Sequence, residues 1–130
     1  MLEPGPSAKI RALGRGYVAF ATSYPSRVRL MFTHEIPDWS IHAGLIEAAN
    51  EAYAIISVAV HERLSQPGAA PVDPKLATVA AWAGVHGLAT LIADRQIQPF
   101  MTGGADDEAI ACVLTGIFDA GLGNPAGFKP

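Results

Sequence analysis

The stretch WAGVHGLATL, residues 82–91, places a histidine between two glycines within a helical pattern of alanine, leucine and valine. A histidine in such a place can act as a general base, bind a metal or line a ligand pocket. Catalysis by His86 requires a nucleophile or an orienting carboxylate within reach, and the sequence does not show one. A metal site requires further ligands at suitable spacing, and neither His-x-x-x-His nor paired cysteines occur. The sequence therefore favours a structural or pocket-lining His86.

The two glycines that flank this histidine are unfavourable inside a helix, by roughly 1 kcal/mol each relative to alanine. Gly84 and Gly87 are three residues apart, which places them near the same side of the helix. We expect them to allow a neighbouring helix to come close. Trp82 and His86 are four residues apart and share a neighbouring face.

A second group of possible ligands surrounds the start of the third predicted helix. His34, Glu35, Asp38 and His42 offer the oxygen and nitrogen atoms that a divalent metal can bind. Helix capping by Asp38, together with solvated loop residues, explains the same residues equally well. No P-loop, dinucleotide-binding glycine pattern or serine-nucleophile motif occurs either. We expect no metal, no cofactor and no enzymatic activity.

The aromatic side chains suggest a different kind of site. Tyrosine and tryptophan carry polar groups that need partners when they are buried. On converging helices, such side chains can line an apolar cavity with a few polar points, which is typical of a small-molecule site. A plain hydrophobic core is the alternative. The pocket candidates, with Tyr53 and His86 expected to supply hydrogen bonds, are Tyr17, Phe20, Met31, Phe32, Trp39, Tyr53, Ile56, Trp82 and His86.

The composition limits the class of protein. A chain of 130 residues fits a single domain, and 50% hydrophobic against 16% charged residues leaves surplus apolar surface for a subunit interface or a cavity. The net charge of −3 and the thinly spread Lys and Arg residues argue against nucleic-acid binding by this chain. No apolar run is uninterrupted over the length of a membrane span. Cys112 is the single cysteine and the N-terminus has no signal-peptide core, so we expect a cytoplasmic protein.

The elements that position these residues all follow a helical pattern. Apolar residues recur at three- and four-residue spacing, which predicts an all-α domain of about five helices over residues 7–23, 25–32, 39–66, 74–95 and 106–120. Asp38 or Ser40 is expected to cap the third helix, and Asp73 the fourth. The third helix carries two apolar rows, which predicts burial against more than one neighbour. Residues 96–108, QIQPFMTGGADDE, are expected to form a loop up to the acidic start of the fifth helix, and residues 1–6 and 123–130 to be frayed.

Two motifs together resemble a known family. RGYVAFATSYPSRVRLMF, residues 15–32, resembles the first helix and the short second helix of the C-terminal domain of TetR-type regulators. WAGVHGLATLI, residues 82–92, resembles the Trp-x-x-x-His-Gly signature of the WHG subgroup of that domain. The order and spacing of the two motifs also match, and the resemblance extends from about Ser7 to Leu122.

The resemblance implies an all-helical domain that binds an effector in an apolar cavity, into which Trp82 and His86 would point. It also implies a homodimer, in which the last two helices of each copy form a four-helix bundle. From helical spacing, the interface candidates are Val79, Ala83, Leu91, Val113, Leu114, Ile117 and Phe118. In most members of the family, effector binding changes the spacing of two DNA-reading heads and releases the operator.

The chain departs from the family pattern because it contains no helix-turn-helix segment, and DNA would be bound only through such a segment. It is therefore interpreted as a fragment or a stand-alone remnant of the effector domain, a homodimer that binds a small apolar or amphipathic effector and no membrane. Two alternatives remain open. One is a ligand-binding protein that acts without DNA, and the other is a helical enzyme that uses His86 as a base.

Overall fold

The computed structural model describes residues 4–32 and 38–128, except for the side chain of Trp39. This part of the chain is all-α and contains no strand, as predicted. The elements are α1 (Pro6–Ser23), α2 (Pro25–Met31), η1 (Trp39–Ile41), α3 (Ala43–Leu64), α4 (Pro74–Ala93), α5 (Pro99–Thr102), α6 (Asp107–Leu122) and η2 (Pro125–Phe128).

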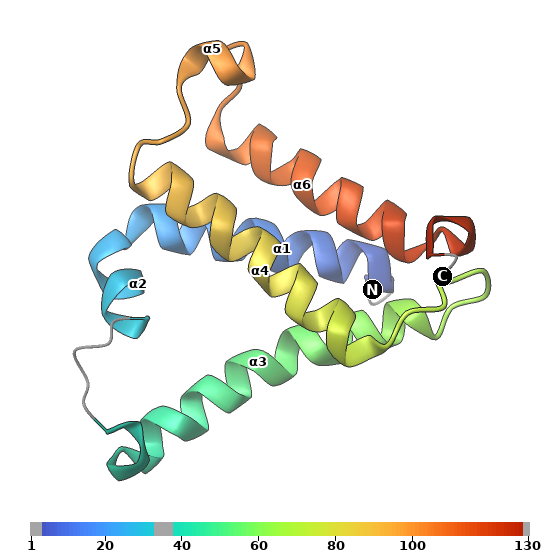
Figure 1. Ribbon diagram of the computed structural model, residues 1–130, viewed down its shortest axis with the longest axis horizontal. Helices are drawn as coiled ribbons and strands as arrows, with labels where there is room; N and C mark the ends of the chain where they lie inside the picture. The colour runs from blue at the N-terminus through green and yellow to red at the C-terminus, as the bar shows by residue number, and fades with distance from the viewer. Residues whose placement is uncertain (1–3, 33–37, 129–130) are drawn as a thin grey trace.

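The first helix is the centre of the bundle. α1 packs against α6, α4 and α3, while α4 also contacts α3 and α6 (Figure 1). Figure 1 shows α3 diverging from the others, so that only its C-terminal part lies beside α1 and α4. Tyr53, near the middle of α3, still reaches α4, where its ring contacts Trp82.

Helix starts follow the local rules read from the sequence. Asp73 caps α4 by accepting hydrogen bonds from the backbone N–H groups of Lys75 and Leu76, and Pro74 occupies the first turn. Asp106 caps α6 through the N–H of Ala109. Negative side chains also fill the first turn of α6, where the helix dipole favours them.

The core consists of two clusters of mostly small side chains. One joins α1, α3, α4 and the end of α6 through Ile10, Ala59, Val60, Ala77, Ala81 and Leu122. The other joins α1, α2, α4 and α6 through Val18, Ala21, Val28, Val85, Ala89 and Ala111. Because these side chains are small, the helices lie close together and the large aromatic residues are displaced to the periphery.

Gly14 lies at a tight contact between α1 and α6. It is buried, and a methyl group at this position would collide with the Cγ2 atom of Thr115 and press on Val85. Thr115 is itself buried and donates its hydroxyl to the carbonyl of Ala111. The glycine that permits tight packing within the chain is therefore in α1.

The sequence suggested that Gly84 and Gly87 of α4 let a neighbouring helix come close, but no helix of the described chain does so at these positions. A methyl group on Gly84 would only touch Leu114 at 4.0 Å, and one on Gly87 would meet nothing within 4 Å. The expected close approach of a neighbouring helix at these two positions is therefore wrong for the bundle itself.

One buried carboxylate joins three helices at the end of the bundle where α1 begins. Asp119 of α6 is 4% exposed and accepts hydrogen bonds from Arg63 of α3 at 2.8 Å and from Arg11 of α1 at 3.1 Å. Burial alone raises the pKa of Asp119, but hydrogen bonds from Arg63, Ser7 and Arg11 more than offset this effect, and the pKa lies below its ordinary value. The carboxylate is therefore charged and fully partnered in the folded protein.

The third predicted helix begins later and is less buried than expected. Residues 39–66 divide into η1 and α3, and the N-cap of α3 is His42 rather than Asp38 or Ser40. The Asp38 carboxylate instead accepts hydrogen bonds from Ser40. α3 packs against both α1 and α4, as the two apolar rows predicted, but only Ala59 and Val60 of the helix are buried. The N-terminal half of α3 extends past its neighbours, which leaves most apolar residues of that half exposed.

The connection between α4 and α6 and the chain end also differ from the prediction. Pro99–Thr102 form the short helix α5 in place of a continuous loop. α6 continues to Leu122, and η2 lies within the region that was expected to be frayed. Proline at the first turn favours both short helices, because its φ angle already suits a helix.

α3 and α4 are both long and apolar enough in composition to cross a bilayer. The core helix of a soluble protein passes the same test, and α4 packs against α1, α3 and α6 in this bundle. Length and composition therefore do not distinguish a membrane helix from a core helix here.

Candidate functional site

Five of the predicted pocket residues come together where α1, α2, α3 and α4 meet. They are Tyr17, Phe32, Tyr53, Trp82 and His86, and we call them the aromatic cluster. His86 is at its centre, with its ring 4.3 Å from that of Phe32 and 6.1 Å from that of Tyr17, centroid to centroid. Trp82 links His86 to Tyr53 across α4 and α3.

Backbone geometry explains this convergence. Trp82 and His86 project from one side of α4 because they are four residues apart. Tyr17 lies on the buried side of α1 next to Val18, and Phe32 follows α2 as its C-cap residue. Pro25 begins α2 directly after α1, which turns the chain back toward α4.

A short hydrogen bond connects the polar atoms of the cluster. Tyr17 Oη lies 2.7 Å from His86 Nδ1. Burial raises the pKa of the Tyr17 hydroxyl above its ordinary value, and a hydrogen bond from the Trp82 side chain offsets part of this rise. Tyr17 therefore remains protonated at neutral pH and can donate to a neighbour.

The cluster is not closed off from solvent. Phe32 is 39% exposed, Tyr53 39% and Trp82 37%. Rings of this size are strongly buried in an ordinary core. The cluster thus presents aromatic faces at the surface while its tyrosine–histidine pair lies underneath.

A cavity of about 270 Å³ adjoins the cluster between α2 and α4. Phe32 and His86 line it, together with Ala21, Pro25, Val28, Arg29, Ala89, Thr90, Ala93 and Asp94. Arg29 and Asp94 form an ion pair of 2.6 Å at this cavity. No local pattern indicates this pair, because its members are 65 residues apart, one in α2 and the other at the C-cap of α4.

The other four pocket candidates lie outside the cluster. Phe20 pairs with Tyr24 at a centroid distance of 5.4 Å, and Met31 is 47% exposed without a ring contact. Ile56 packs against the α1–α3–α4 core instead. Helical spacing fixes a face but not the neighbour that it meets, and the assignment of these three residues to the pocket stays a prediction. The side chain of Trp39 is outside the described part of the structure.

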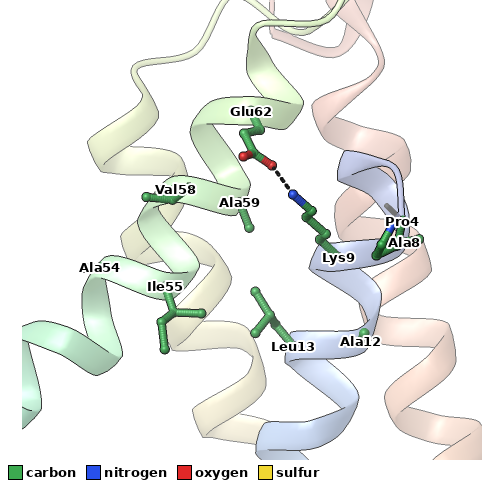
Figure 2. A pocket seen from close by; sticks show the side chains of 10 residues that line it. All are labelled: Pro4, Ala8, Lys9, Ala12, Leu13, Ala54, Ile55, Val58, Ala59 and Glu62. Carbon is green, nitrogen blue, oxygen red and sulfur yellow. Dashed lines mark hydrogen bonds and ion pairs between the residues drawn. The ribbon is translucent and has the colours of Figure 1, made fainter. Parts of the chain in front are cut away.

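A larger cavity lies elsewhere. A groove of about 600 Å³ runs between α1 and the C-terminal half of α3, with Leu13, Ile55 and Val58 among its apolar walls (Figure 2). Lys9 and Glu62 form a 3.1 Å ion pair across it. None of the predicted pocket residues lines this groove. The aromatic cluster is the better candidate site, because its polar atoms are positioned by one another next to exposed apolar faces.

Two other sequence interpretations bear on this region. Within the described residues, no group of three His, Cys, Asp or Glu side chains is placed to hold a metal. His34 and Glu35, half of the possible metal site, lie outside the described residues. Among the described residues, the His86 ring contacts Tyr17, Phe32 and Trp82 and no carboxylate.

Comparison with protein families identifies the domain. The chain matches the model of the tetracycline repressor-like C-terminal domain over residues 10–115, which includes both motifs, all of α2, α3 and α4, and parts of α1 and α6. The chain belongs to the TetR family. No curated protein and no solved structure matches it significantly. Proteins with this domain are transcriptional regulators rather than enzymes, and such domains typically dimerise and bind small-molecule effectors.

In this TetR-type domain, α4 and α6 carry apolar residues on their outer sides. Val79 is 50% exposed, Leu91 48%, Val113 62% and Ile117 67%, and Ala83 is also exposed. Gly87 lies between Ala83 and Leu91 at four-residue spacing, on the same outer row. The described part of the chain therefore leaves the outer sides of α4 and α6 largely uncovered.

Two of the interface candidates point the other way. Leu114 packs against the cluster of Val18 and Val85, and Phe118 packs against the cluster of Val60 and Leu122. Position 114 follows position 113 by about 100° around the helix, which turns these side chains toward the core, and their role in an interface stays a prediction. The remaining candidates are Val79, Ala83, Leu91, Val113 and Ile117.

Proposed function

We propose that this chain is the effector-sensing and dimerisation domain of a cytoplasmic TetR-type transcriptional regulator of the WHG subgroup. The aromatic cluster is the effector site, and the outer sides of α4 and α6 form the homodimer interface. The effector is a small apolar or amphipathic molecule. Operator DNA is read by a helix-turn-helix segment outside these residues, and effector binding releases it, as in a repressor.

The observation that carries this proposal is the arrangement of the aromatic cluster. Phe32 and Trp82 are more than a third exposed, beside a cavity of about 270 Å³ that His86 also lines. The Tyr17–His86 hydrogen bond fixes the orientation of the polar atoms before any ligand arrives. Apolar walls with a few oriented polar groups are the usual composition of a small-molecule site.

A ligand screen by thermal shift tests the effector site. A molecule that binds the folded state raises the melting temperature by mass action. We expect an apolar library to contain stabilisers of the native chain whose effect is lost in Phe32→Ala. The matched control is Ile55→Ser, which alters the α1–α3 groove at a side chain that is 59% exposed. The site assignment is rejected if no compound stabilises the chain, or if Ile55→Ser abolishes the effect and Phe32→Ala does not.

Light scattering tests the dimer. Carboxylates introduced at Val79 and Ile117 would be desolvated in an interface between two copies, so the double variant Val79→Asp/Ile117→Asp should be monomeric at micromolar concentration. The control is Phe100→Asp on α5, at a side chain that is 85% exposed but lies outside the proposed interface. A native chain with a monomer mass contradicts the dimer, as does a double variant that remains dimeric.

A further inference from the structure

The cavity beside the aromatic cluster has a buried apolar part and an exposed charged part. Ala21, Val28 and Ala89 line it and are buried. Arg29 and Asp94 line it as well, but their side chains are exposed and mark its mouth. A ligand that enters this cavity therefore places its apolar body on small buried side chains and its polar group beside an ion pair.

The ion pair at the mouth keeps some of its hydrogen-bonding capacity. Arg29 Nη2 donates to Asp94 Oδ1 at 2.6 Å. Within the described residues, the other N–H groups of the guanidinium and the Oδ2 atom of Asp94 have no protein partner. A guanidinium has five N–H donors, and both oxygens of a carboxylate accept. The mouth of the cavity can therefore donate a hydrogen bond from Arg29 and accept one at Asp94 while the pair stays intact.

The two charges together make this mouth unfavourable for ions of either sign. A ligand carboxylate that approaches Arg29 also approaches Asp94, and a ligand ammonium group at Asp94 also meets Arg29, because only 2.6 Å separates the paired atoms. Repulsion then offsets much of the attraction, and the ion still loses part of its hydration. An uncharged group that carries both a donor and an acceptor, such as an amide, loses less hydration and can bond to both side chains.

We propose that the Arg29–Asp94 pair determines the charge of the effector, and that the site selects neutral molecules with an amide-like group on an apolar body. The group accepts a hydrogen bond from Arg29 and donates one to Asp94. Acids and amines of the same shape are disfavoured, because the opposite charge that would attract them is already paired. This inference rests on the proposed effector site, and it adds the chemical class of the ligand.

Three probes of similar shape test this selection at neutral pH. Naphthalene-2-carboxamide is neutral, 2-naphthoate is an anion and 2-naphthylmethylammonium is a cation. Isothermal titration calorimetry should show that the native chain binds the carboxamide roughly fivefold more tightly than either ion, a modest factor because the pair is exposed to water. Phe32→Ala should weaken the binding of all three probes, because Phe32 lines the same cavity.

Removal of one charge should change the order of the three affinities. Asp94→Asn leaves Arg29 unpaired and should bring 2-naphthoate to at least the affinity of the carboxamide, whereas Arg29→Gln should do the same for the ammonium probe. The matched controls are Glu108→Gln and Arg15→Gln, which change the net charge equally at an ion pair of α1 and α6 that does not line the cavity. Both controls should leave the order unchanged.

The outcomes separate this inference from the effector site on which it rests. Equal affinity of the native chain for the three probes overturns the selection, as does a preference for one of the ions. A change of order that the controls produce as strongly as Asp94→Asn and Arg29→Gln also overturns it. In these cases the effector site stands as long as Phe32→Ala weakens binding. Binding of none of the probes, or binding that Phe32→Ala leaves unchanged, contradicts the effector site, and the inference falls with it.

Discussion

The polar groups at the two ends of the bundle differ in their burial and in the side chains around them. At the end where α1 begins, Asp119 is 4% exposed and its carboxylate is fully bonded by Arg63 and Arg11. At the end where α2 crosses α4, Tyr17 and His86 bond each other beneath rings that are more than a third exposed. At the first end, the chain's own arginine side chains supply the hydrogen-bond partners of the carboxylate. At the second end, aromatic side chains remain exposed, and a ligand could cover them.

This contrast separates stability from binding within one small domain. A buried ion pair that joins three helices fixes their relative positions, because removal of either partner leaves an uncompensated charge. An exposed aromatic cluster adds less to stability and more to recognition. Changes at the Asp119 end should therefore alter unfolding, and changes at the aromatic end should alter binding.

The largest expected effect is at the closed end. Asp119→Ala leaves Arg63, whose side chain is only 14% exposed, without its carboxylate partner. We expect the free energy of unfolding to fall by about 3 kcal/mol, measured by urea denaturation. A loss below 1 kcal/mol would show that the ion pair is not what joins α1, α3 and α6.

The same carboxylate predicts a dependence on pH. The pKa of Asp119 in the folded state lies below its ordinary 3.8, so its contribution to stability is present above that pH and is lost as the pH falls below it. The difference in unfolding free energy between the native chain and Asp119→Asn should be constant near neutral pH and shrink below pH 3.8. A difference that grows on acidification contradicts this assignment.

The next largest effect concerns the glycines. Gly14→Ala forces a methyl group against Thr115, and we expect a loss of about 2 kcal/mol, which Thr115→Ser should partly restore by removing the clashing Cγ2. The matched control, Gly87→Ala, meets nothing within 4 Å in the chain and should stabilise the monomer by up to about 1 kcal/mol. Chemical denaturation at low protein concentration measures both. Equal effects at the two positions would contradict the packing described for α1 and α6.

A smaller effect is expected at the aromatic end. Tyr17→Phe removes one hydrogen bond from a half-buried histidine that water can reach, which should lower the free energy of unfolding by about 1 kcal/mol. The pKa of Tyr17 is raised above 10.0, so native stability should also fall as the pH rises beyond that value, and the variant should lack this fall. Thermal unfolding at pH 7 and above pH 10 measures both. A loss of unfolding free energy as large as that of Asp119→Ala would contradict the proposed difference in stability between the two ends.

The smallest effect is expected at the exposed ion pair of α2 and α4. Asp94→Asn removes a partner of Arg29, but the two side chains are 43% and 64% exposed. We expect a change in unfolding free energy within about 0.5 kcal/mol, measured in the same denaturation series. A large loss would mean that this pair, like Asp119, joins the helices.

The features that the sequence predicted correctly depend on residues that lie close together in the chain. The Asp73 cap, the proline starts and the shared face of Trp82 and His86 involve residues at most four positions apart, and the structure confirms them. The all-α fold and the family also followed from patterns along the chain.

The sequence could not predict contacts between distant segments. Tyr17 and His86 are 69 residues apart, and Arg11 and Asp119 are 108 apart, so no local pattern pairs them. For the same reason, the sequence does not show that Gly14 permits the tight contact between α1 and α6, and it suggests this role for Gly84 and Gly87 instead. The exposed N-terminal half of α3 shows that an apolar row predicts a face, but not whether a neighbour covers it.

Chemical-shift mapping of a stabilising ligand tests the central claim most directly. With a hit from the thermal-shift screen, ¹H–¹⁵N and aromatic ¹H–¹³C spectra report which side chains the ligand touches. The account predicts the largest shifts at the Trp82 indole, the His86 ring and Phe32, with little change at Leu13 and Val58. Shifts concentrated at Leu13 and Val58 would place the ligand in the α1–α3 groove and contradict the aromatic cluster as the effector site.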